Sequence, residues 1–215
     1  MKQGIIRLIN LFIGLMLYAL GIIISIKANI GYAPWDVFHV GLSGTLGISL
    51  GIISIFVGIV IVILVTILGE KLGLGTVLNV LFIGAFIDII LNLDIIPLGK
   101  NITTGIIMLF IGMLTISFGS YFYIKSGLGV GPRDNLMVVM AKKTKIPVGI
   151  CRGIVELSVT LIGWKLGGMV WFGTVLFVIA IGFCVQFTFK LLKFDVTAVK
   201  HESLGNTYKA LFGKK

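Results

Sequence analysis

Charged residues are scarce in this chain, and their scarcity argues against a soluble globular domain. Only 12% of the 215 residues are charged, whereas 58% are hydrophobic. A soluble domain is about half apolar and about a quarter charged. Several apolar runs reach the ~20 residues that a helix needs to cross a bilayer, and none alternates as the strands of a membrane barrel do. The sequence therefore predicts an all-α membrane protein.

Cysteine is also rare, and no familiar catalytic motif is present. Cys151 and Cys184 both lie in apolar segments, so neither a disulfide framework nor a zinc site is expected. The glycine-rich stretch 127–131 lacks the Lys-Ser/Thr ending of a phosphate-binding loop. We therefore expect no enzyme activity, no cofactor and no metal. The net charge of +10 is expected to attract anionic lipids of the cytoplasmic leaflet rather than nucleic acid.

An internal repeat relates the two halves of the chain with an offset of 98 residues. Residues 11–88 align without a gap with residues 109–186, and about two dozen of the aligned positions are identical. The identical positions include three loop residues, in that Gly31, Pro34 and Asp36 align with Gly129, Pro132 and Asp134. Polar matches in one register indicate that a single membrane domain, residues 1–215, contains two copies of one structural unit.

Each copy is expected to contain a long span, a short helix and two further spans. The expected spans cover residues 5–26, 50–69, 74–92, 104–124, 148–166 and 171–192. The short helices, 34–46 and 132–145, each begin with Pro and have Asp two residues later. They cover only ~20 Å, less than a ~30 Å hydrocarbon core. The sequence thus predicts six transmembrane helices in two inverted three-span repeats, each with a short non-spanning half-helix.

The distribution of basic residues favours a topology with both termini in the cytoplasm. Six spans place 14 basic residues inside, including those of the basic tail 194–215, against three outside. If the short helices also crossed, the chain would have eight spans, parallel repeats and a split of 12 to 5. That arrangement satisfies the same rule, but the length of the short helices favours six.

Inverted repeats with interrupted segments at matching positions are typical of secondary transporters, which bind solutes where the repeats meet. Ionisable residues inside spans are rare and usually face a cavity or a partner. The candidate residues for binding a solute or ion are Asp36, His39, Asp88, Arg133, Asp134, Asn135, Arg152 and Glu156. The backbone of the two loops that precede the short helices is expected to contribute through Gly31, Pro34, Gly129, Gly131 and Pro132.

These candidates also have purely structural explanations. The short helices can lie at the membrane interface, with the two aspartates stabilising their N-termini. Arg152 and Glu156 are four residues apart and can pair with each other on one helix. Asp88 can lie at the end of its span, and His39 can be an interfacial side chain. Four glycines are expected to let helices approach closely, namely Gly14, Gly21, Gly84 and Gly182.

Two segments resemble the signature motifs of a known family. The first is 28–37, followed by 47–51, and the second is 127–137. They resemble the motifs of the bacterial YczE-like membrane proteins, grouped with the YyaS and YitT types. The resemblance covers about residues 5–192. It implies a location in the bacterial cytoplasmic (inner) membrane, and it implies no established substrate or activity.

The repeat and the polar residues together predict a secondary transporter or a channel-like carrier of a small solute or ion. The alternative is a non-transporting membrane accessory protein that binds lipid or supports another complex. A substrate-binding subunit of a larger uptake system fits the size and charge, but the repeat does not argue for it. A polar cavity that reaches Asp36 and Asp134 would favour transport, whereas a dry, packed interface would favour the accessory role. A homo-oligomer is compatible with either.

Overall fold

The computed structural model describes residues 2–199 and residue 202. Within this part of the chain there are eight α-helices, one turn of 3-10 helix and no strand. The α-helices are α1 (Lys2–Lys27), α2 (Pro34–Leu46), α3 (Leu50–Ile67), α4 (Leu74–Leu93), α5 (Ile102–Lys125), α6 (Pro132–Thr144), α7 (Val148–Lys165) and α8 (Phe172–Leu191). A helix is present at each expected position, with bounds that differ by at most three residues. Most of the expected basic tail, 194–215, lies outside the described residues.

The long helices have the length and composition of membrane spans. Five of them, α1, α3, α4, α5 and α8, are apolar enough to cross a bilayer, and α6 with α7 passes the same test as one broken span bent by 120°. Taken alone, α7 does not pass, because it carries Arg152, Glu156 and Lys165. Large apolar side chains are exposed along the outer faces of these helices, as expected where lipid replaces water. The chain is therefore a helical membrane protein with five to six candidate spans.

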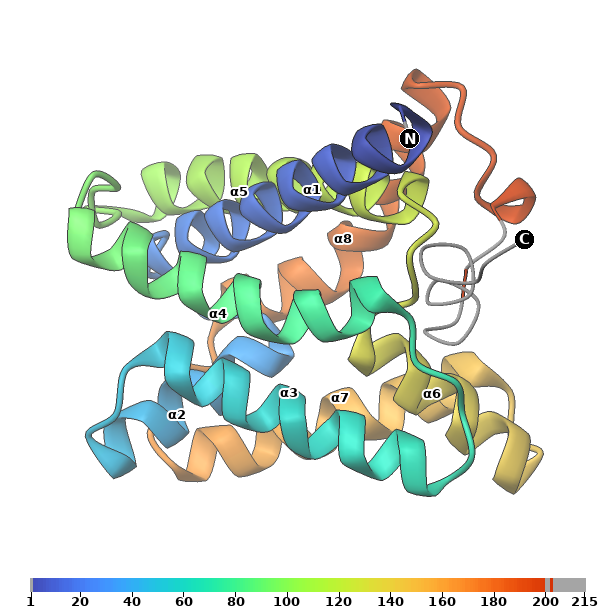
Figure 1. The fold of residues 1–215 in the computed structure, drawn as a ribbon. Coiled ribbons are helices and arrows are strands. Elements are labelled where there is room, and N and C mark those ends of the chain that lie inside the picture. The colour runs from blue at the N-terminus through green and yellow to red at the C-terminus, as the bar shows by residue number, and fades with distance from the viewer. Residues whose placement is uncertain (1, 200–201, 203–215) are drawn as a thin grey trace, which may run out of the picture.

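The helices are arranged in two layers (Figure 1). In the first layer α1 packs along α5, while α4 packs on α1 and α8 packs on α5. In the second layer α2 packs on α7 and α3 packs on α6. Helix packing between the layers is largely confined to α3 and α4.

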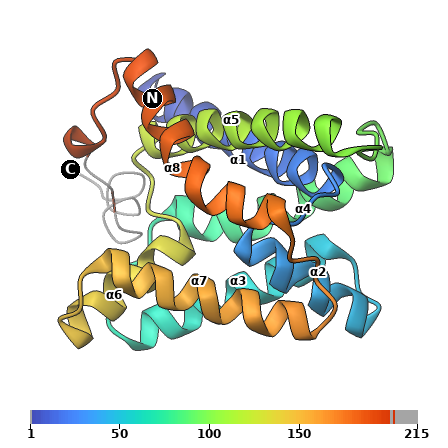
Figure 2. The same cartoon turned by 180° about the vertical axis from the view of Figure 1, so that it is seen from behind.

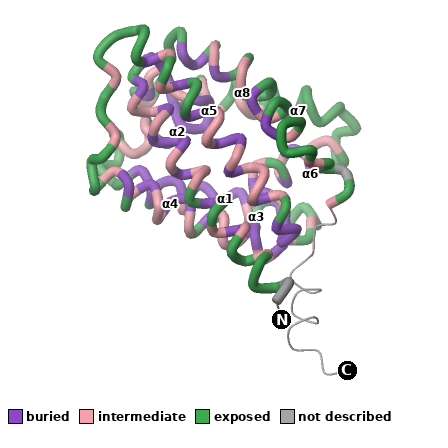
Figure 3. Tube along the Cα trace, turned by 90° about the horizontal axis from the view of Figure 1, so that it is seen from above, coloured by how far each residue is buried: buried purple, intermediate pink, exposed green. Residues whose placement is uncertain are grey.

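Each layer has its own hydrophobic core. The larger cluster of buried side chains is centred on α1 and α5, with Leu15, Ile23 and Met113 among its members. The smaller cluster lies in the second layer and includes Ile53 and Val139. Figure 3 shows that buried residues follow the inner helix faces, whereas the outer faces and many loop residues are exposed. The larger cluster also includes Leu50 at the start of α3, so the two layers meet there.

Glycines bring α1 and α5 into backbone contact. A Cβ on Gly14 would lie 2.9 Å from the carbonyl oxygen of Gly119, and a Cβ on Gly21 would lie 2.7 Å from that of Gly112. Because the earlier glycine of α1 meets the later glycine of α5, the two helices run antiparallel. The expected close approach at Gly14 and Gly21 is confirmed.

The other two expected glycines behave differently from each other. A Cβ on Gly84 of α4 would clash with the carbonyl oxygen of Gly51 on α3, so close approach is confirmed there. No atom lies within 4 Å of the corresponding Cβ position on Gly182 of α8. The prediction for Gly182 is therefore wrong for this structure. The physical reason is that α7 and α8 hardly touch (Figure 2), whereas the equivalent helices α3 and α4 pack closely.

Two extended loops carry the chain into α2 and α6. The carbonyl oxygen of Ile30 accepts a 2.6 Å hydrogen bond from the backbone N–H of Gly173 at the start of α8. The carbonyl oxygen of Leu128 accepts a 2.7 Å bond from the N–H of Gly75 at the start of α4. Irregular backbone inside a membrane protein needs such internal partners. As a result, α2 and α6 both begin in the middle of the molecule, between the layers (Figure 1).

Candidate functional site

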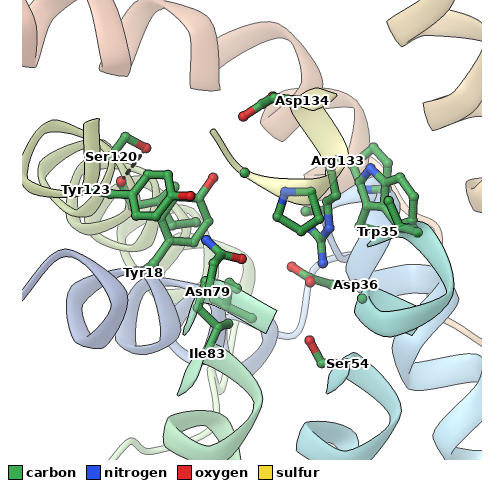
Figure 4. Close-up of a pocket in the computed structure, with 18 of the residues that line it drawn as sticks. Tyr18, Trp35, Asp36, Ser54, Asn79, Ile83, Ser120, Tyr123, Arg133 and Asp134 are labelled. Carbon is green, nitrogen blue, oxygen red and sulfur yellow. Dashed lines mark hydrogen bonds between the residues drawn. The ribbon is translucent and has the colours of Figure 1, made fainter. Parts of the chain in front are cut away.

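A cavity of about 370 Å³ lies between the two layers, where α2 and α6 begin. Six of the eight candidate side chains line it, and Figure 4 shows several of them together. They are Asp36, His39, Arg133, Asp134, Arg152 and Glu156. The charged groups all come from the second layer, through α2, α6 and α7. The structure thus brings together most of the residues that the sequence singled out.

The first turns of α2 supply buried polar groups to this cavity. Pro34 starts the helix, where its fixed φ is favourable, and Asp36 follows in the first turn. Asp36 is 4% exposed and His39 is 2% exposed, so both side chains are buried inside the protein. No ion pair or hydrogen bond joins the Asp36 carboxylate to another described residue. His39 Nε2 and Trp35 Nε1 are also buried without a hydrogen-bond partner in the described structure.

The start of α6 provides the charged groups opposite α2. The Arg133 guanidinium carbon lies 4.8 Å from the centre of the Trp35 ring, a cation–π contact. In Figure 4 the Arg133 side chain extends towards Asp36. Trp35 and Arg133 occupy equivalent positions of the two copies, so these equivalent residues contact each other across the cavity. Asp134 is exposed and lines the same cavity.

On α7, the guanidinium of Arg152 is paired within its own helix. Its Nε donates a 2.8 Å hydrogen bond to Oε1 of Glu156. The pairing that their spacing predicted is therefore present, and both side chains also line the cavity. The pair contributes no net charge, but it places polar atoms on the α7 side of the wall.

The first layer contributes uncharged polar side chains that the sequence analysis did not select. They are Tyr18 of α1, Asn79 of α4, and Ser120 and Tyr123 of α5. The hydroxyl of Tyr123 is buried without a hydrogen-bond partner in the described structure. Each of these residues is a polar side chain within a long apolar run, which is the signal that could have identified it.

Two candidate side chains lie elsewhere. The carboxylate of Asp88 accepts hydrogen bonds from Ser49 Oγ (2.6 Å) and from the backbone N–H of Gly51 (2.8 Å). It therefore joins α4 to the N-terminus of α3, where a negative charge is favourable. Asn135 is buried in α6 and does not line the cavity.

Most of the loop residues that were expected to contribute backbone to the site line the cavity. Four of them line the cavity, namely Pro34, Gly129, Gly131 and Pro132. Gly31 instead packs on the start of α8, where a Cβ would lie 2.9 Å from the backbone nitrogen of Thr174. Its φ of 109° also favours glycine.

The charges around the cavity do not cancel. Three carboxylates and two guanidinium groups line it, so with His39 neutral the formal charge is −1. Charges and polar groups that are buried without partners are unfavourable. A positively charged ligand with hydrogen-bonding groups would neutralise this charge and give the buried polar groups partners. Within the described residues, no group of three or more His, Cys, Asp or Glu side chains is placed to hold a metal ion.

Comparison with known proteins identifies relatives along most of the chain. Residues 5–190 match the model of a family described as "Family of unknown function (DUF6198)". The "Uncharacterized membrane protein YczE" of Bacillus subtilis is 35% identical over 191 residues, which cover 87% of this chain and 88% of that protein. An "Uncharacterized protein" of Haemophilus influenzae is 32% identical over 185 residues, 84% of each chain.

A third relative is more distant. The "Uncharacterized protein YyaS" of Bacillus subtilis is 26% identical over 166 residues, 76% of this chain and 83% of that protein. No solved structure matches the chain. The resemblance that the two loop motifs indicated is confirmed: the chain belongs to the DUF6198 family of YczE-like membrane proteins.

Proposed function

We propose that this protein is a secondary transporter that binds a small polar solute or ion in the cavity between its two layers. The observation that carries the proposal is that one cavity reaches both Asp36 and Asp134, in the first turns of the two half-helices. Its volume of about 370 Å³ is within the range of small-molecule sites. A dry, packed interface between the repeats would have favoured the accessory role instead.

Reciprocal contacts support the inverted repeat on which this function depends. Shifted by 98 residues, the contact of Gly14 with Gly119 corresponds to that of Gly21 with Gly112. The hydrogen bond from Gly75 to the Leu128 carbonyl corresponds in the same way to the bond from Gly173 to the Ile30 carbonyl. Such exchange is expected if repeats 11–88 and 109–186 are related by a two-fold axis perpendicular to α1 and α5. Transporters with inverted repeats bind their solutes near this axis.

The balance of charge favours a cation as the solute. A ligand with one positive charge would neutralise the formal charge of −1 in the cavity, and removal of the ligand would leave a carboxylate uncompensated. Trp35 Nε1, His39 Nε2 and the Tyr123 hydroxyl would bind its polar groups. A protonated amine with hydrogen-bond acceptors fits this description.

We also propose that the end of the molecule that carries Arg7 and Lys142 faces the cytoplasm of a bacterial cell. Arg7 Nε donates a 2.7 Å hydrogen bond to the carbonyl of Ser126 at the end of α5. Lys142 pairs with Glu70 in the α3–α4 loop, so the basic end of α6 lies near that loop. This gathering of positive charge is the pattern expected on the cytoplasmic side, next to anionic lipid.

Thermal stabilisation of the purified protein by ligands tests the function. A ligand that binds the folded state must raise its stability. The panel contains inorganic monovalent cations, primary and quaternary amines, and carboxylates of matched size. We expect at least one cation to raise the melting temperature and to be accumulated by proteoliposomes that contain the protein. Stabilisation by anionic lipid alone, with no response to any cation, would instead support the accessory role.

A further inference from the structure

The contact between α3 and α4 has no counterpart in the second half of the chain. The 98-residue offset relates α3 to α7 and α4 to α8. Other helix contacts occur as equivalent pairs: α1–α4 with α5–α8, α2–α3 with α6–α7, and α2–α7 with α3–α6. In contrast, α3 packs closely on α4 while α7 and α8 hardly touch. The two halves therefore differ most at this helix contact.

The residues at this contact show the difference most clearly. Gly51 and Gly84 are so close that a Cβ on Gly51 would clash with the Gly84 carbonyl oxygen. Their equivalents, Gly149 and Gly182, have no atom within 4 Å of their Cβ positions. The second half therefore has the same pair of glycines but not the contact that they make in the first half.

The cavity extends towards the side where contact is missing. It is lined by Arg152 and Glu156 of α7 and by Val178 of α8. On the other side, Gly58 of α3 lies against α4, where its Cβ would be 2.8 Å from Cγ1 of Val80. The cavity is thus lined on one side by α3 and α4, which pack closely, and on the other by α7 and α8, which hardly touch.

We propose that the two layers rock against each other, so that α7 packs on α8 through Gly149 and Gly182 while α3 separates from α4. This inference rests on the proposed transport function. The motion gives the cavity access to the opposite side of the membrane. Most members of each hydrophobic cluster lie within one layer, so most of this packing can be kept during the motion. The loop hydrogen bonds of Ile30 and Leu128 lie between the layers and are related by the repeat, so they are the natural hinges.

The side chains beside the glycines indicate which conformation is more stable. Asp88 accepts two hydrogen bonds, from Ser49 and from the N–H of Gly51, and bonds to a carboxylate are the stronger kind. Asp88 is equivalent to Gln186, which has a neutral amide in place of the carboxylate. Ser49 is equivalent to Pro147, which has no side-chain donor. In the second conformation Gln186 would accept one bond, from the N–H of Gly149. The conformation with α3 on α4 is therefore the more populated one without ligand.

Paired cysteines test this motion without any knowledge of the solute. In a background that lacks Cys151 and Cys184, one variant carries Ser49→Cys with Asp88→Cys, and the other carries the equivalent Pro147→Cys with Gln186→Cys. With a short thiol cross-linker applied to native membranes, we expect both pairs to cross-link, the second more slowly. Single-cysteine variants are the controls. If only the first pair cross-links, the layers do not rock and the inference is wrong. Absence of cross-linking in the first pair would contradict the α3–α4 contact itself.

A spin-label distance measurement tests the same motion in case the paired-cysteine variants fold poorly. Ile150 of α7 and Phe183 of α8 are exposed, so labels there should not disturb packing. We expect two distance populations in lipid, with the shorter one changing in weight when a stabilising cation is added. A single population would overturn the rocking motion. Transport of a cation with a single population would refute the motion while leaving the proposed function intact.

Discussion

Asp36 and Asp134 occupy equivalent positions in the two repeats but have different surroundings. Asp36 is buried, whereas Asp134 is exposed within the cavity. The repeat of Gly, Pro and Asp made this pair predictable from the sequence. The role of Asp88 was not predictable, because nothing in a linear sequence shows that its carboxylate meets the start of α3.

The buried carboxylate should be essential for binding a cation. Asp36→Asn preserves shape but removes one negative charge, which brings the formal charge of the cavity to zero. We expect at least a tenfold loss of affinity for a cationic solute, or about 1.4 kcal/mol, with unchanged elution in size-exclusion chromatography. Asp94→Asn is the matched control, because Asp94 lies in the exposed α4–α5 loop and pairs with Lys27. Full cation flux by a folded Asp36→Asn protein would make Asp36 a helix-stabilising residue only.

At the scale of the elements, helix positions were more predictable than helix partners. Pro34 and Pro132 mark the starts of the short helices, and apolar runs mark the spans, so the bounds agree within three residues. Packing depends on which glycine faces which backbone. Gly84 and Gly182 have equivalent sequence contexts, yet only Gly84 lies against a neighbouring helix. A sequence that serves two conformations does not reveal which one a structure contains.

Equivalent substitutions at these glycines should therefore have unequal effects. Gly84→Leu introduces a side chain where even a Cβ would clash with the Gly51 carbonyl oxygen, and overpacking costs about 1–3 kcal/mol. We expect a lower melting temperature for this variant. Gly182→Leu enters open space and should melt like the wild type, while transport falls because α7 can no longer pack on α8. Equal melting temperatures for the two variants would contradict the α3–α4 contact, and normal transport by Gly182→Leu would contradict its role in closure.

At the scale of the whole molecule, the two short helices extend to opposite ends from a common centre (Figure 1). Six spans with inverted repeats therefore predict that their C-terminal ends face opposite sides of the membrane. In a background without native cysteines, Ser43→Cys should react with an impermeant thiol reagent from outside the cell, and Lys143→Cys should react only after the membrane is opened. Labelling of both from the same side would instead support eight spans and parallel repeats.

The most direct test of the account is access to the centre of the cavity from both sides of the membrane. Ser120 of α5 lines the cavity, and Ser120→Cys is a small change in a background without Cys151 and Cys184. Ile107→Cys, at an exposed apolar position of the same helix, is the control that should not react. We predict that a membrane-impermeant thiol reagent labels Ser120→Cys in both right-side-out and inside-out vesicles, and that a stabilising cation slows the reaction. Labelling from one side only would show a cavity that never changes sides, and would contradict transport by this protein.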